Sequence, residues 1–128
     1  MFKINVSAII SKDDKILIIQ RSETEDMFPG FWGIPGGTME ISDKSIEDCL
    51  RREIMEEVGV EIGNIQFLTS ENSNGKIYIK FTALYVKGEI HALDGVASVN
   101  WLGLNELDGK KFTPNTKKWL IKTLNKLK

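Results

Sequence analysis

Apolar residues recur at every fourth position between residues 46 and 58, and this spacing predicts an α-helix. The four positions are Ile46, Leu50, Ile54 and Val58. They fall on one face of such a helix, which we expect to pack on the core. Ser42 or Asp43 is suited to cap its first turn, and Gly59 is suited to end it in a left-handed conformation. These limits give about four turns.

Strand patterns surround this helix on both sides. Residues 2–10 begin with alternating polar and apolar positions and end in an apolar run, as a strand does when it enters a sheet covered on both faces. A polar turn follows, and Lys15–Gln20 is the predicted return strand. We expect three more strands, at residues 65–69, 76–86 and 96–102. Asn74 and Gly75 form a strong hairpin turn between the first two of these.

The C-terminal segment predicts a short helical turn at residues 104–107 and a second long helix. Thr113 is the expected N-cap, and Pro114 is the expected first helical residue. The apolar face of this helix would bury Trp119, Leu120, Leu124 and Leu127. A mixed sheet between two helices is an α/β/α sandwich, and 128 residues with 41% hydrophobic content predict one domain over residues 1–128.

Three glutamates within five positions give the first helix its chemistry. Glu53 and Glu57 project close to the buried stripe, and Glu56 lies about one neighbouring position further round the helix axis. Like charges at the edge of a core are costly unless something neutralises them. A hard cation such as Mg²⁺ or Mn²⁺ would do so, since it prefers carboxylate oxygens.

Arginines offer a second way to neutralise these acids. Glu47 and Arg51, and likewise Asp48 and Arg52, stand four residues apart, which is the spacing of helical ion pairs. Spacing alone leaves both a metal site and an ion-paired structural helix open.

Gly37 and residues 52–60 resemble the signature of the Nudix hydrolases. That signature runs glycine, five residues, glutamate, seven residues, then Arg-Glu-aliphatic-any-Glu-Glu-any-Gly-aliphatic. The run Arg-Glu-Ile-Met-Glu-Glu-Val-Gly-Val fits its second half at every specified position. The first half departs from it by one inserted residue, so the expected glutamate falls on Asp43 counted from Gly37 and on Lys44 counted from Arg52.

The resemblance implies an α/β/α fold and Mg²⁺-dependent hydrolysis of a phosphoanhydride in a nucleoside diphosphate linked to a group X. It assigns Glu56 and Glu57 as principal metal ligands and Glu53 as ligand or general base. Arg52 would orient Glu53, and the carbonyl of Gly37 would join the ligands. Asp94 is the acidic candidate for a further ligand from a later loop.

Four other residues are candidates for binding the substrate. Arg21 ends a buried strand, where it is either an edge charge or a phosphate ligand. Phe31 and Trp32 either fill the core or stack on a base. Asn115 either starts the last helix or reads a base edge.

Composition and charge limit the partners. A net charge of −1 argues against general attraction to nucleic acid or membrane, although residues 109–128 carry seven lysines and no acid. We interpret those lysines as a solvated face. The single cysteine, Cys49, predicts core packing in a reducing compartment, and no apolar run is long enough to span a membrane. We therefore expect a cytoplasmic monomer or homodimer with a small nucleotide substrate, and no catalytic role for His91.

The sequence supports two classes of function. The first is a small, MutT-like nucleoside triphosphate pyrophosphohydrolase, with ADP-ribose, nucleotide sugars or dinucleoside polyphosphates as rival substrates. The second is a Nudix-fold module that senses a nucleotide without cleaving it. The intact glutamates Glu53, Glu56 and Glu57 favour the enzyme.

Overall fold

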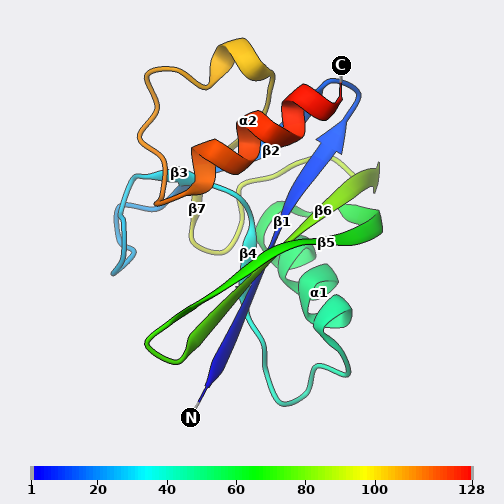
Figure 1. The fold of residues 1–128 in the computed structure, drawn as a ribbon, viewed down its shortest axis with the longest axis vertical. Coiled ribbons are helices and arrows are strands. Elements are labelled where there is room, and N and C mark those ends of the chain that lie inside the picture. The colour runs from blue at the N-terminus through cyan, green and yellow to red at the C-terminus, as the bar shows by residue number, and fades with distance from the viewer. Residues whose placement is uncertain (1, 128) are drawn as a thin grey trace.

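A single mixed sheet of seven strands forms the centre of the molecule. The computed structural model describes residues 2–127. The strands are β1 (Lys3–Lys12), β2 (Lys15–Arg21), β3 (Trp32–Gly33), β4 (Gly36–Thr38), β5 (Glu61–Ser73), β6 (Lys76–Lys87) and β7 (Val96–Leu102). Two α-helices, α1 (Ile46–Val58) and α2 (Thr116–Lys126), and one 3₁₀ turn, η1 (Leu104–Glu106), complete the fold. Figure 1 shows their arrangement.

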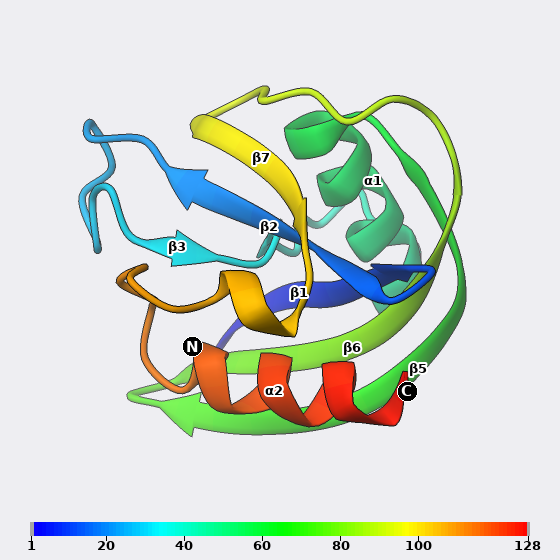
Figure 2. The same ribbon diagram turned by 90° about the horizontal axis from the view of Figure 1, so that it is seen from above.

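The sheet has the order β3-β2-β1-β6-β5, with β4 paired to β1 and β7 paired to β2. β1 and β6 are parallel, and the other pairs are antiparallel. β1 is therefore shared by three neighbours, and Figure 2 shows it passing beneath β2 at the centre of the molecule. This confirms the predicted mixed sheet.

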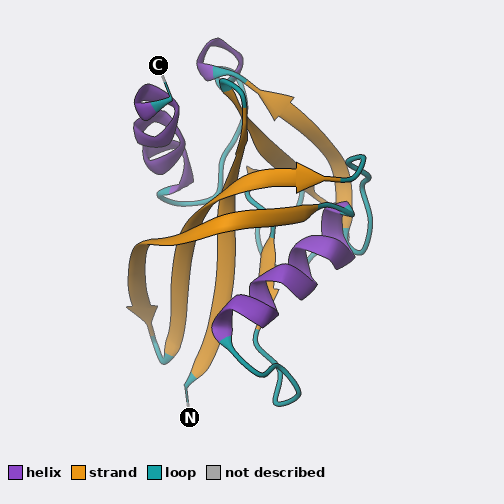
Figure 3. Ribbon diagram, turned by 90° about the vertical axis from the view of Figure 1, so that its right-hand side faces the viewer, coloured by secondary structure: helices purple, strands orange, loops and turns teal. Residues whose placement is uncertain are grey.

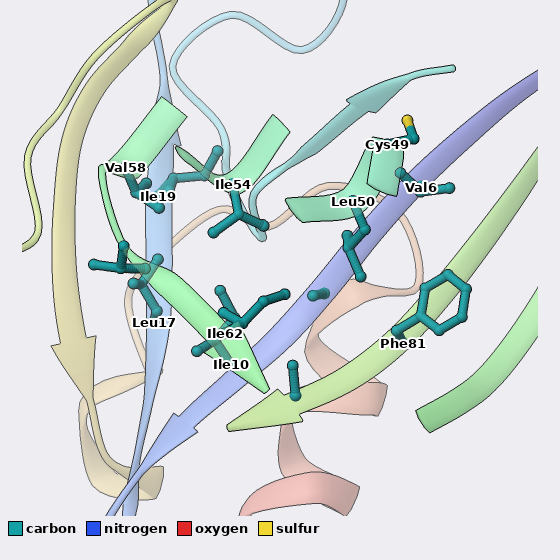
Figure 4. Packing of buried hydrophobic residues seen from close by; sticks show 13 residues of the cluster. Val6, Ile10, Leu17, Ile19, Cys49, Leu50, Ile54, Val58, Ile62 and Phe81 are labelled. Atoms are coloured by element: carbon teal, nitrogen blue, oxygen red, sulfur yellow. The ribbon is translucent and has the colours of Figure 1, made fainter. Parts of the chain in front are cut away.

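The two helices lie on opposite faces of the sheet, as the sandwich prediction requires. Figure 3 shows the strands between α1 on one side and α2 on the other. Alternate residues of β1 and β2 serve the two sides. Val6, Ala8, Ile10, Leu17 and Ile19 pack with the α1 residues Leu50, Ile54 and Val58, as Figure 4 shows. Ile9, Ile16 and Ile18 pack with Leu120 and Leu124 of α2.

Three of the four positions in the predicted apolar stripe of α1 are buried, and Ile46 is partly buried. Leu50, Ile54 and Val58 are fully buried, and Cys49 joins them as core packing. Each such aliphatic side chain contributes about 1.5–3 kcal/mol by burial, against about 1 kcal/mol for a good N-cap. Tertiary packing therefore contributes more to holding α1 than its caps do.

The start of α1 differs from the prediction, and its end does not. Ser45 is the N-cap, with its side chain accepting a hydrogen bond from the N–H of Asp48. The prediction of Ser42 or Asp43 was wrong because the Asp43 carboxylate is held by other donors, described below. Gly59 ends the helix at φ 77°, as expected.

The start of α2 was also predicted too early. The helix begins at Thr116, with Asn115 in the N-cap position at φ 65°, so Thr113 and Pro114 lie outside it. The reason lies in β3: Thr113 donates a backbone hydrogen bond to Trp32, and residue 112 forms a bridge with the same residue. This pairing holds residues 112–113 extended.

Three further expectations can be compared directly. The hairpin at Asn74 and Gly75 is confirmed, with both residues at positive φ between β5 and β6. β5 is longer than predicted at both ends, because it runs from Glu61 to Ser73 where a strand over residues 65–69 was expected. Within residues 2–127, no helix is long and apolar enough to cross a membrane.

Candidate active site

Arg52 is the centre of the acidic cluster on α1. Its Nε and one Nη donate to the two carboxylate oxygens of Asp43 at 2.8 and 2.7 Å. The other Nη donates to Glu53 at 2.9 Å and to Glu56 at 3.2 Å. One guanidinium therefore ties the loop before α1 to two of the three predicted metal ligands.

The pair between Arg52 and Asp43 fixes both charges. The Asp43 side chain is only 5% exposed. Its hydrogen bond from Arg52, followed by one from the N–H of Glu40, holds the pKa of Asp43 well below its usual value. The same bond raises the pKa of Arg52. Two parallel bonds of this kind are among the strongest polar contacts in proteins.

This geometry bears on the departure from the signature. Of the two candidates for the glutamate position of the signature, Asp43 binds the Arg52 side chain through two hydrogen bonds. α1 begins only at Ile46, so the inserted residue lies in the loop before the helix. The two helical ion pairs considered as an alternative to a metal, Glu47 with Arg51 and Asp48 with Arg52, do not form among residues 2–127. Arg52 donates to Asp43, and Arg51 donates to the carbonyl of Ile62.

Glu57 is the most perturbed acid of the cluster. It accepts a 2.7 Å hydrogen bond from the N–H of Gly36. Burial nevertheless raises the pKa of Glu57 to about 8, and the charges of Glu53 and Asp94 act in the same direction. Burial also raises the pKa of Glu53. Both acids thus lie where a carboxylate charge is costly without a cation.

The glycine pair lets β4 approach these acids. A Cβ on Gly37 would lie 2.1 Å from a carboxylate oxygen of Glu53. A Cβ on Gly36 would lie 2.0 Å from the carbonyl oxygen of Val6 in β1. The missing side chain of Gly37 therefore leaves space for the Glu53 carboxylate, and that of Gly36 leaves space for the backbone of β1.

The loop between β6 and β7 brings Asp94 to the end of α1. The N–H groups of His91 and Leu93 donate to the carbonyls of Val58 and Glu57 at 3.0 and 2.9 Å. These contacts hold the loop against the last turn of the helix, where the Asp94 charge acts on Glu57. His91 contributes its backbone to this docking.

An open cleft of about 420 Å³ lies on the opposite face of the sheet from α1. Its walls combine Met27, Phe28, Ile34, Tyr78 and Pro114 with the polar side chains of Asn5, Ser7 and Lys80. Glu53, Glu56 and Glu57 do not line it. Arg21 does, and it lies close enough to Glu57 to lower the pKa of that acid, so it connects the cleft with the acidic cluster.

The remaining predicted binding residues lie elsewhere. Phe31 and Trp32 do not line the cleft, so its geometry gives no support to base stacking by either ring. Trp32 packs on the core cluster under α2, and the ring of Phe31 lies 5.3 Å from that of Phe28. Asn115 lines a smaller hollow beside the cleft.

The sheet residues that line this cleft were not predicted from the sequence. Asn5 and Ser7 of β1 lie beside Tyr78 and Lys80 of β6 in the parallel register. Their signal was present as polar side chains at alternate positions of otherwise apolar strands. Phe28 was passed over because it lies in a polar loop.

The acidic cluster fits a hard divalent cation in its donor chemistry. Three carboxylates and a glycine carbonyl are oxygen ligands. Within residues 2–127, however, no three acid, histidine or cysteine side chains converge closely enough to hold a metal as they stand. The carboxylates of Glu53 and Glu56 accept hydrogen bonds from Arg52, while that of Glu57 accepts one from the N–H of Gly36. Burial is the main cause of the raised pKa of Glu57, so a cation bound beside it would favour its charged form.

Comparison with known proteins identifies the class. A family model described as "NUDIX domain" matches residues 1–123, and the chain belongs to this family. Two solved structures agree with the fold. A Nudix hydrolase from Nitrosomonas europaea superposes with a TM-score of 0.84 at 19% identity, covering 97% of this chain and 70% of that one. A MutT Nudix hydrolase from Burkholderia pseudomallei gives 0.76 at 25% identity, covering 94% and 96%.

Several relatives carry names of enzymes. An ADP-ribose pyrophosphatase from Methanocaldococcus jannaschii is 31% identical over 89% of this chain and 72% of its own length. The nucleoside triphosphatase NudI of Escherichia fergusonii is 31% identical over 79% and 73%. The NAD-capped RNA hydrolase NudC of Pseudomonas aeruginosa is 30% identical over 77% of this chain but only 35% of its own length. The prediction of a hydrolase acting on acid anhydrides is confirmed at the level of the family.

Proposed function

We propose that this Nudix domain, residues 1–128, cleaves a phosphoanhydride of a nucleoside diphosphate linked to X, and that its substrate is a nucleoside triphosphate, giving the monophosphate and pyrophosphate. One observation carries the proposal: the half-buried Glu57 accepts a 2.7 Å hydrogen bond from Gly36 of β4 near the charges of Glu53 and Asp94, and burial raises its pKa to about 8. This cluster attracts a cation and, through Arg21, adjoins a cleft of about 420 Å³.

Mg²⁺, or Mn²⁺ in its place, would be held by Glu53, Glu56, Glu57 and the carbonyl of Gly37, with Asp94 as a further ligand. Bound there, a divalent ion supplies charge neutralisation on the phosphates and a more acidic water. Nudix hydrolases in general depend on divalent metals, which agrees with this donor set.

The chain's own side chains have distinct roles in this scheme. Arg52 orients Glu53 through its 2.9 Å bond, while Asp43 holds the far side of the same guanidinium. Glu53 acts as a ligand or as the base that takes a proton from water. Arg21 binds a phosphate at the mouth of the cleft. The nucleoside occupies the cleft between the sheet and the segment before α2.

A second candidate substrate is ADP-ribose. The observation that favours it is the likeness to the Methanocaldococcus jannaschii ADP-ribose pyrophosphatase, which covers 89% of this chain. A module that binds a nucleotide without cleaving it is less well supported, because Glu53, Glu56 and Glu57 are all present. A cytoplasmic monomer or homodimer that does not bind nucleic acid remains part of the proposal.

Product analysis over a substrate panel tests the proposal. Pure protein with Mg²⁺ is incubated with nucleoside triphosphates, ADP-ribose and a dinucleoside polyphosphate, and the products are separated by anion-exchange chromatography. We expect monophosphate and pyrophosphate from at least one triphosphate. Cleavage of ADP-ribose alone would select the second candidate substrate. No cleavage of any substrate would favour the module that binds a nucleotide without cleaving it.

A further inference from the structure

A small polar hollow adjoins the cleft. It has a volume of about 100 Å³ and lies between β5, β6 and the start of α2. Glu71, Tyr78 and Lys80 line both the hollow and the cleft, so the two spaces lie side by side. A nucleoside in the cleft would therefore present one of its edges to the hollow.

Hydrogen-bond donors dominate the lining of the hollow. Thr69 and Ser70 of β5 supply hydroxyls, and Asn115 supplies an amide. Lys80 and Lys118 supply two ammonium groups, against the single carboxylate of Glu71. The cleft also carries charged side chains, among them Arg21, Lys76 and Lys80, beside its aromatic and aliphatic walls, and the hollow adds Lys118 and the two β5 hydroxyls. Hydroxyls and ammonium groups are the donors that bind phosphate oxygens.

Lys80 is the second, independent indication of a ligand. It projects from the middle of β6, and burial lowers its pKa while the charge of Glu71 partly offsets this. Among residues 2–127 its ammonium forms no hydrogen bond and no ion pair within 4 Å, including with Glu71. No fully buried side-chain nitrogen or oxygen among residues 2–127 lacks a hydrogen-bond partner, so the Lys80 ammonium keeps contact with solvent. It is therefore open to an anionic ligand, which would favour its charged form.

We propose that this hollow is a second phosphate subsite, which takes a phosphate carried on the ribose of the nucleotide. The substrates would then be nucleoside diphosphate derivatives phosphorylated at the 2′ or 3′ position. This rests on the proposed function in one respect, that the nucleoside occupies the cleft. The hollow places no requirement on which group leaves from the diphosphate.

Ligand binding tests the subsite without turnover. Dissociation constants of AMP and of the 2′,5′- and 3′,5′-bisphosphates of adenosine are measured by calorimetry with the wild-type chain and with Lys80→Met and Lys118→Met. Lys87→Met is the matched control, since Lys87 lies on the same strand but is exposed and near Glu61. Melting temperatures establish that each variant is folded, and exposed Lys118 provides a variant that leaves the core intact.

We expect at least one bisphosphate to bind about tenfold or more tightly than AMP, because charge-assisted bonds to phosphate are strong. Lys80→Met and Lys118→Met should each reduce that preference, and Lys87→Met should leave it unchanged. The proposal is overturned if neither bisphosphate is preferred, or if Lys80→Met weakens AMP and the bisphosphates equally. Cleavage of an unmodified triphosphate is measured separately and tests the proposed function alone.

Discussion

Arg52 and Asp43 form two parallel hydrogen bonds, of 2.8 and 2.7 Å, across the loop that precedes α1. Through Arg52 this pair sets the position of Glu53, so a loop residue outside the helix controls an acid of the site. Asp43 lies in the loop before α1, since the helix starts at Ile46.

The Asp43 carboxylate should give the protein a specific sensitivity to acid. Its pKa is held below the ordinary 3.8 by Arg52, so its contribution to stability is complete above pH 4. As the pH falls below that value, the unfolded chain takes up a proton that the folded chain does not, and the contribution is lost. Asp43→Asn should therefore lower the free energy of unfolding at pH 7 and have progressively less effect toward pH 2.5.

Urea denaturation of wild type and Asp43→Asn across this pH range measures the difference directly. Asp14→Asn, in the exposed turn between β1 and β2, is the control for a change of net charge. A difference between wild type and Asp43→Asn that stays constant down to pH 2.5 would contradict the ion pair.

The two glycines of β4 should respond differently to alanine. In Gly36→Ala the new methyl meets backbone at 2.0 Å, which costs about 1–3 kcal/mol or more of stability. In Gly37→Ala it meets the carboxylate of Glu53, a side chain that is able to move, so activity should fall more than stability.

Chemical denaturation and turnover, measured on both variants, separate these effects. Gly103→Ala is the matched control, because its φ is −91° and the nearest neighbour of a new Cβ lies at 3.6 Å. Equal losses of stability in Gly36→Ala and Gly37→Ala would count against the assigned roles.

The cap of α1 gives a third prediction. Ser45→Ala removes the acceptor for the N–H of Asp48 and should cost about 1 kcal/mol of stability. Ser42→Ala, three residues earlier in the loop, should cost less than about 0.5 kcal/mol. The free energies of unfolding of the two variants show which serine caps the helix. A larger loss in Ser42→Ala than in Ser45→Ala would contradict the assignment of Ser45 as the N-cap.

Local patterns were sufficient to predict most of the fold. The stripe from Ile46 to Val58 predicted α1, and the alternation in β1 and β2 predicted a sheet covered on both faces. The helix starts were missed because tertiary contacts decided them: Arg52 holds Asp43, and Trp32 holds Thr113 extended. Capping preferences describe a helix in isolation and carry no information about such partners.

The candidate site was predictable only where its residues share one element. Spacing on α1 placed Glu53 and Glu57 beside the core, and the structure agrees. The cleft required the pairing of β1 with β6, which brings Ser7 beside Lys80 although 72 intervening residues separate them in the chain. That relationship depends on sheet register, so only the isolated polar residues in apolar strands hinted at it.

The rate of pyrophosphate release by Glu57→Gln tests the central claim most directly. With Mg²⁺ and the triphosphate cleaved best by wild type, Glu57→Gln should stay folded and lose about 10²-fold or more in turnover, because it lacks a metal ligand. Glu47→Gln, exposed on the first turn of the same helix, should turn over like wild type. Equal rates for wild type, Glu57→Gln and Glu47→Gln would contradict an active site built on the buried acids of α1.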